Sequence, residues 1–337
     1  MSKVNIHLNI IRIIACLLVI FMHAPLPNEH ANGLFLSTLS YITAPCIGLF
    51  FMVSGSLLLP IKTDAISFIK KRLSKVVAPT LFWSAFYIIA NIIKGDEVPL
   101  MKEWISILFS AQGNPVLWFM YTLIGLYLLA PILSRWLQAA TQKELELYLG
   151  IWGISLCYPI LAPFVEINTS NTGILYYFTG YAGYFVLGYY LKQYPQRLSW
   201  KVLLPVLLVS IVAPVWCKIM QWQVNFYEVF WYLSIFVVIQ CICCYIFITQ
   251  YKREPKKEVI RKGITQISNL SFGIYLIHIF IMRYLLWEWS FIQSIDSYVL
   301  QTVVIGVLTF VISTISCYFI SLLPFAKYLI GYQTKKA

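Results

Sequence analysis

The strongest constraint on the fold is a series of long apolar segments that recurs along the whole chain. Ten such runs lie between short polar or charged loops, at residues 9–26, 41–60, 77–94, 116–134, 146–163, 174–191, 202–219, 229–249, 267–287 and 299–323. A helix needs ~20 consecutive apolar residues to cross a bilayer. The sequence therefore predicts an all-α integral membrane protein with about ten transmembrane helices.

The composition agrees with a membrane protein and excludes several other classes. Only 11% of the 337 residues are charged and 60% are hydrophobic, whereas a soluble domain is ~25% charged. A soluble enzyme, a nucleic-acid-binding protein and a disordered chain are thus excluded, and we expect no nucleic-acid partner. The cysteines lie mostly inside apolar runs without the spacing of a metal site, so no metal site or disulfide framework is predicted.

The distribution of lysine and arginine predicts the orientation in the membrane. When the loops are assigned alternately to the two sides, twenty of these residues fall on one side and four on the other, while Arg12 lies inside the first run. Basic residues collect in cytoplasmic loops, so both termini are predicted to be cytoplasmic. We expect the first run to be a span rather than a cleaved signal peptide, and residues 1–337 to form a single membrane domain.

Two polar residues in the first run are candidates for function. Arg12 and His23 are eleven positions apart, which on a helix places them on one face, ~16 Å apart along the axis. A cation near the cytoplasm and an imidazole in the outer half would suit a reaction chamber reached from both sides. Alternatively, Arg12 snorkels to the inner interface and His23 caps the helix.

Two further groups of residues have both a functional and a structural interpretation. His278 ends the segment SFGIYLIH in the ninth run, with Tyr275 on the same helix face. It could be part of a functional site, or it could be a buried histidine whose ring forms a hydrogen bond with the neighbouring hydroxyl. Lys71, Arg72 and Lys75 lie at the cytoplasmic start of the third run, where they could hold a phosphate group or simply follow the positive-inside rule. No carboxylate lies at the centre of a predicted span, which disfavours an ion-coupled transporter.

The chain resembles the acyltransferase-3 family of integral membrane O-acyltransferases. The resemblance rests on the arginine and histidine of the first run with the stretch ACLLVIFMH, on LFFMVSG at 49–55, on LWF at 117–119, on Leu187-Gly188, and on SFGIYLIH at 271–278. These motifs occur in the order of the family between residues 9 and 280. Among members of the family, the chain is most similar to the O-acetyltransferases that modify enterobacterial common antigen. It departs from the family pattern at Asn9, where aspartate is frequent, and at Ser56, where tyrosine is frequent.

The resemblance implies a multi-pass protein of the bacterial inner membrane that transfers an acyl group, in particular acetyl, from cytosolic acyl-CoA to a hydroxyl of a surface or lipid-linked glycan. Acetyl-CoA is then a donor substrate, with no permanently bound cofactor, and the partners are acyl-CoA, the glycan and membrane lipid. His23 would be the general base, and Arg12 would stabilise a polar part of CoA or hold the hydrogen-bond network of the site. The resemblance and the charges together suggest that Arg72, Lys75 and Lys71 bind the donor's phosphates. Ser54, Trp118, Tyr275 and His278 are candidates for the chamber wall. The alternative is a multispan transporter or flippase for a glycan precursor.

Overall fold

The fold is helical throughout the part of the chain that the structure describes. The structure is a computed structural model that describes residues 5–27, 33–95, 97–161, 164–168, 170, 172–222, 229–251 and 255–334. Within these residues every regular element is a helix and there is no strand, so the predicted all-α class is confirmed.

Among the described residues, seven helical segments are long and apolar enough to cross a membrane. They are α1 (Ile6–His23), α2 with α3 (Gly33–Thr43 and Pro45–Leu58), α4 (Ala65–Ile93), η1 with α6 (Pro115–Leu117 and Trp118–Ala139), α10 (Trp200–Ile219), α13 with η3 (Glu258–Ile279 and Phe280–Leu286), and α15 (Tyr298–Ser321). The chain is a multi-pass membrane protein. The cytoplasmic position of its termini stays a prediction.

The other three predicted spans correspond to shorter helices. These are α7 (Gln142–Ser155), α9 (Ala182–Gln193) and α12 (Ile235–Thr249), with 14, 12 and 15 residues. At ~1.5 Å per residue they are roughly 18–22 Å long, less than the ~30 Å of a hydrocarbon core. The predicted count of ten spans is therefore not confirmed. Apolar composition alone could not show that residues 174–181, counted as part of one span, form turns and a 3-10 helix, η2 (Tyr176–Phe178), which Gly180 follows at φ 100°.

The remaining helices are short, and the chain divides into two compact units. The short helices are α5 (Met101–Ser106), α8 (Tyr158–Leu161), α14 (Ser290–Gln293) and α16 (Ala326–Ile330). The first unit contains residues 1–60 and 134–265, and the second contains residues 61–133 and 266–337. We describe each unit by itself, and the single membrane domain over residues 1–337 stays a prediction.

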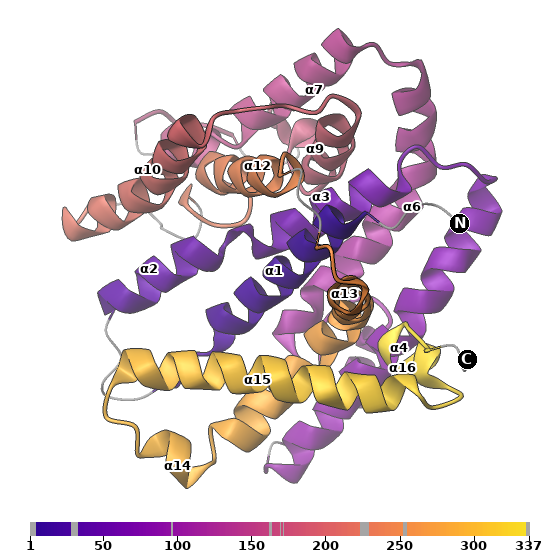
Figure 1. Cartoon of the computed structure of the whole chain (residues 1–337), viewed down its shortest axis with the longest axis vertical. Coiled ribbons are helices and arrows are strands. Elements are labelled where there is room, and N and C mark those ends of the chain that lie inside the picture. Colours follow the sequence, from indigo (N-terminus) through magenta and orange to yellow (C-terminus); the bar gives the residue numbers. More distant parts are fainter. Residues whose placement is uncertain are drawn as a thin grey trace. The chain divides into compact units, whose positions relative to one another are not determined.

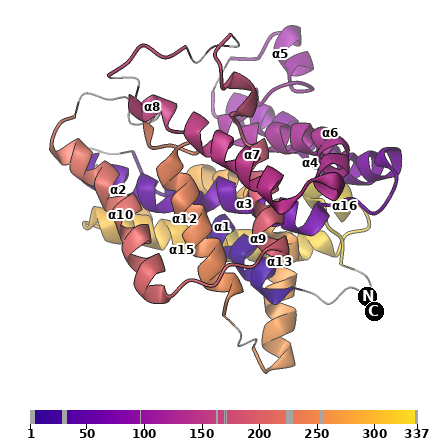
Figure 2. The same cartoon turned by 90° about the horizontal axis from the view of Figure 1, so that it is seen from above.

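Helix α3 is at the centre of the first unit, where it packs against α9, α1 and α12 (Figures 1 and 2). The backbones of α3 and α9 touch at two glycines. A Cβ atom on Gly55 would lie 1.9 Å from the Phe185 carbonyl oxygen, and one on Gly188 would lie 2.0 Å from the Met52 carbonyl oxygen. The glycines of the LFFMVSG and Leu187-Gly188 motifs are therefore the contact that lets these two helices approach closely.

A buried hydroxyl joins the same helices to α12. The Ser56 hydroxyl oxygen lies 2.7 Å from the Gly188 carbonyl oxygen and 2.8 Å from the Tyr245 hydroxyl. Ser56 is fully buried, and buried polar groups require such partners. Ser56 thus connects α3 to both α9 and α12.

In the second unit, a tyrosine from α4 is inserted into α13. The Tyr87 hydroxyl donates to the Leu276 carbonyl oxygen at 2.8 Å and accepts from the Phe280 amide at 3.2 Å. In an uninterrupted α-helix these two backbone groups would bond to each other. The insertion lies where the α-helix becomes the π-helical segment η3, and a side chain that enters the backbone ladder is a known cause of such a change.

Candidate functional site

The two polar residues of the first run lie on one unbroken helix, as predicted. Asn5 begins α1 by accepting hydrogen bonds from the amides of His7 and Leu8, which is the usual role of an N-cap residue. Arg12 and His23 are both half-buried, and His23 is the last residue of α1. The helical path keeps them ~16 Å apart on one face. The reaction-chamber and the capping hypotheses both place His23 at this position, so both remain open.

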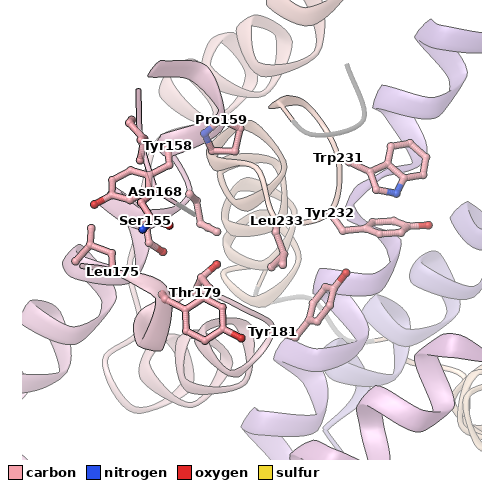
Figure 3. Close-up of a pocket in the computed structure, with 13 residues that line it drawn as sticks. Ser155, Tyr158, Pro159, Asn168, Leu175, Thr179, Tyr181, Trp231, Tyr232 and Leu233 are labelled. Atoms are coloured by element: carbon pink, nitrogen blue, oxygen red, sulfur yellow. The ribbon is translucent and has the colours of Figure 1, made fainter. Parts of the chain in front are cut away.

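The first unit contains a cavity with a volume of about 500 Å³. It lies at the C-terminal end of α7 and at the N-terminal ends of α9 and α12 (Figure 3). Its lining consists of Ser155, Leu156, Tyr158, Pro159, Ile167, Asn168, Leu175, Tyr176, Thr179, Tyr181, Trp231, Tyr232 and Leu233. Ser155, Leu156 and Tyr232 are buried and form its floor, whereas Asn168 and Thr179 are exposed at its mouth.

The floor of this cavity contacts the end of α1 next to His23. The Tyr232 hydroxyl donates to the Met22 sulfur at 3.0 Å, and the Tyr232 carbonyl oxygen accepts from the Tyr184 hydroxyl at 2.6 Å. The motif on α3 packs against one residue of the cavity wall, because the ring of Phe51 lies 5.2 Å from the ring of Tyr181, centroid to centroid. No sequence motif predicted this cavity, because its wall comes from chain segments about 75 residues apart.

A second cavity lies at the opposite ends of α9 and α12 and has a volume of about 260 Å³. It is lined by Asn5, Leu191, Lys192, Pro195, Gln196, Arg197, Tyr245, Thr249 and Gln250. Lys192 donates to the Ser56 carbonyl oxygen at 2.5 Å. Asn5 is seven residues before Arg12 and therefore shares its helix face. Lys192 and Arg197 are among the basic residues whose distribution predicts the topology, and nothing in the sequence places them beside the start of α1.

The second unit brings together three of the predicted chamber residues. The Tyr275 hydroxyl donates to the Val116 carbonyl oxygen, and its ring centroid lies 5.2 Å from that of Phe119, which stacks edge-on with Trp118. His278 is fully buried, and its Nδ1 lies 2.5 Å from the Tyr275 carbonyl oxygen. A carbonyl can only accept, so Nδ1 carries the proton and, in the neutral ring, Nε2 is an acceptor. The backbone of Tyr275 is thus one hydrogen-bond partner of His278, and both interpretations of this histidine stay open.

The basic segment lies at the start of α4 in the second unit. Lys71 and Lys75 are exposed, and the half-buried guanidinium of Arg72 lies 5.6 Å from the ring centroid of Phe68. Asp64 caps the helix, because its carboxylate accepts from the Ser67 amide at 2.9 Å. This hydrogen bond holds the pKa of Asp64 below its usual value.

The predicted site residues fall into two groups. Arg12, His23 and the half-buried Ser54 belong to the first unit, whereas Trp118, Tyr275, His278 and the three basic residues belong to the second. The roles of all these residues stay predictions. Among the described residues, no group of three or more histidine, cysteine or acidic side chains could hold a metal ion.

Comparison with known proteins identifies one family. The model of an acyltransferase domain, that of the acyltransferase-3 family, matches residues 5–321, nearly the whole chain. No curated protein and no solved structure matches the chain.

Proposed function

The chain belongs to the acyltransferase-3 family, and from that premise we propose that it transfers an acetyl group from cytosolic acetyl-CoA to a hydroxyl of a surface or lipid-linked glycan. The observation that carries this proposal is the placement of Arg12 and His23 on one face of α1, with a cavity that begins beside Met22. As a finer assignment, we propose that the chain is an O-acetyltransferase of the type that modifies enterobacterial common antigen. We also propose that it lies in the bacterial inner membrane.

His23 is the general base in the proposed reaction. Its neutral imidazole takes the proton of the acceptor hydroxyl while the hydroxyl oxygen attacks the thioester carbonyl. The new carbon–oxygen ester bond forms, the carbon–sulfur bond breaks, and the imidazolium returns the proton to the departing CoA thiolate. Arg12 is ~16 Å away along the helix, too far to contact the same carbonyl, and instead interacts with a polar part of the donor.

Three short helices support transfer between the two sides of the membrane. We propose that α7, α9 and α12 lie within the membrane. Because each is shorter than a hydrocarbon core is thick, the backbone beyond its ends would then lie at membrane depth, where non-helical backbone is tolerated only beside protein or water. Cavities lie at both ends of α9 and α12. In the predicted orientation, the smaller one opens to the cytosol and the larger one to the outer side.

The phosphates of the donor have two candidate sites. Lys71, Arg72 and Lys75 offer three positive charges at the start of α4, and Lys192 and Arg197 offer two beside the smaller cavity. Arginine and lysine are suited to phosphate oxygens in either place. We propose the segment on α4 as the site, because it has the greater charge.

The competing function is a carrier or flippase for a glycan precursor. The two cavities at opposite ends of the same short helices would also fit a substrate that enters from one side and leaves on the other. A carrier moves its substrate without a covalent change, so the two functions differ in their product.

Mass spectrometry of cell-surface glycans distinguishes the two functions. A strain that lacks the gene is complemented with wild type, with His23→Ala, or with His7→Ala, a control on the same helix but near the opposite face. We expect an acetyl-sized mass on the glycan with wild type and His7→Ala, and its loss with His23→Ala at equal amounts of protein in the membrane. Unchanged acylation in every strain would refute the acetyltransferase and favour the carrier.

A further inference from the structure

The chemistry of the larger cavity indicates what it binds. Five aromatic side chains contribute to its lining: Tyr158, Tyr176, Tyr181, Trp231 and Tyr232. None of the thirteen described residues around it is charged. An anionic ligand would therefore lose its hydration without gaining a charged partner, which is costly. The lining favours an uncharged ligand.

The polar groups of the lining are of the kind that bind hydroxyls. Ser155 donates its hydroxyl proton to the Trp152 carbonyl oxygen at 2.6 Å, so its oxygen retains lone pairs that can accept. Thr179 lies exposed at the mouth, and the tyrosines add phenolic groups that can donate or accept. Neutral groups of this kind, next to flat aromatic faces, complement a sugar ring, which has hydroxyls at its edge and C–H groups on its faces.

The arrangement in Figure 3 fits a ligand of this kind. Side chains from the end of α7 and those of Asn168, Leu175 and Thr179 lie on one side of the cavity, Trp231 and Tyr232 lie on the other, and the ring of Tyr181 points between them. The volume of about 500 Å³ is within the ~300–1,000 Å³ of pockets that enclose small ligands. The space is therefore suited to the end of a glycan rather than to a whole acyl-CoA.

We infer that this cavity binds an uncharged sugar ring at the end of the acceptor glycan. The inference rests on the proposed function, and it adds a substrate class and a binding site to it. The Tyr232 hydroxyl joins the cavity floor to Met22, the residue before His23. A sugar bound on this floor is thus close in the fold to the proposed base, and Tyr181 and Trp231 are binding residues that act on the ring itself.

Saccharide titration of the full-length protein in nanodiscs tests the inference. The probe is N,N′-diacetylchitobiose, a neutral disaccharide called chitobiose below, and the comparison ligand is the anionic sugar glucuronate; binding is followed by isothermal titration calorimetry. We expect saturable binding of chitobiose that greatly exceeds that of glucuronate. Tyr181→Ala should weaken chitobiose binding roughly tenfold, the loss expected for one aromatic contact.

Matched variants make the test independent of misfolding. Tyr177 and Ile174 are 81% and 87% exposed on the same segment and do not line the cavity, so Tyr177→Ala and Ile174→Trp should bind chitobiose as wild type does. Thr179→Trp, which fills the mouth from an exposed position, should abolish binding. Equal binding by Thr179→Trp and Ile174→Trp, preferential binding of glucuronate, or no saturable chitobiose binding to wild type would each overturn the inference.

The same variants separate this inference from the proposed function. If chitobiose binds in the cavity but glycans remain unacetylated with wild type, the sugar site stands and the acetyltransferase proposal fails. If glycans are acetylated with wild type and equally with Thr179→Trp, the acetyltransferase stands and the sugar site is wrong.

Discussion

Removal of the Tyr87 hydroxyl tests the origin of the π-helical segment. Tyr87 is 1% exposed, and Tyr87→Phe keeps its ring while it removes the oxygen that bridges Leu276 and Phe280. Each of the two hydrogen bonds has a net value of ~1 kcal/mol, and a buried group left without a partner costs ~1–3 kcal/mol. The two freed backbone groups can recover part of this loss by bonding to each other. We therefore expect the free energy of unfolding to fall by about 1–3 kcal/mol.

The measurement is reversible unfolding in mixed micelles with increasing SDS, followed by far-UV circular dichroism. Tyr318→Phe is the matched control, because Tyr318 is 42% exposed on α15. Its free energy of unfolding should stay within ~0.5 kcal/mol of wild type. If Tyr87→Phe unfolds like this control, the inserted hydroxyl does not maintain the π-helical segment, and another cause must be sought.

Three further variants test the packing, the donor site and a helix cap. Gly188→Ala should destabilise the detergent-solubilised protein by ~3 kcal/mol or more through overpacking, whereas Gly150→Ala, with open space around it, should not; equal melting temperatures would contradict the glycine contact. Arg72→Ala should raise the KM for acetyl-CoA roughly tenfold but not that for acetyl-pantetheine, which lacks the nucleotide phosphates; if Arg197→Ala has this effect instead, the phosphates bind at the smaller cavity. Asp64 has a lowered pKa, so its stabilisation is complete above the unfolded value of ~3.9 and is lost as the pH falls through the folded pKa. Asp64→Asn should lack that loss of stability when melting is measured against pH, and an unchanged acid profile would refute the role of the cap.

The sequence was sufficient for the fold class and for the longest helices. Length and apolarity predict α1, α4, α6, α10, α13 and α15 because these properties are local. The placement of Arg12 and His23 on one face of α1 follows from their spacing in the sequence, so it was predictable as well. The three short helices are different, since their apolar runs continue into turns whose path depends on what packs around them.

The candidate site was only partly predictable for a related reason. A motif marks residues that lie near each other in the sequence. The motifs that contain Gly55 and Gly188 therefore did not show that Gly55 lies against the backbone of Phe185 and Gly188 against that of Met52. The cavity lined by Ser155, Tyr181 and Tyr232 is formed by segments far apart in the chain. Its residues carry ordinary aromatic and hydroxyl side chains, which occur throughout membrane proteins and therefore do not mark a site in the sequence. Only the packing of α7, α9 and α12 brings them together.

The most direct test of the central claim follows an acetyl label from donor to glycan. The purified chain is reconstituted in vesicles, radiolabelled acetyl-CoA is supplied on one side, and extracted glycan acceptor is supplied with the membrane. We predict that wild type attaches the label covalently to the glycan, and that His23→Ala does not at equal amounts of folded protein. Transport of the glycan across the vesicle membrane without any attached label would contradict the claim.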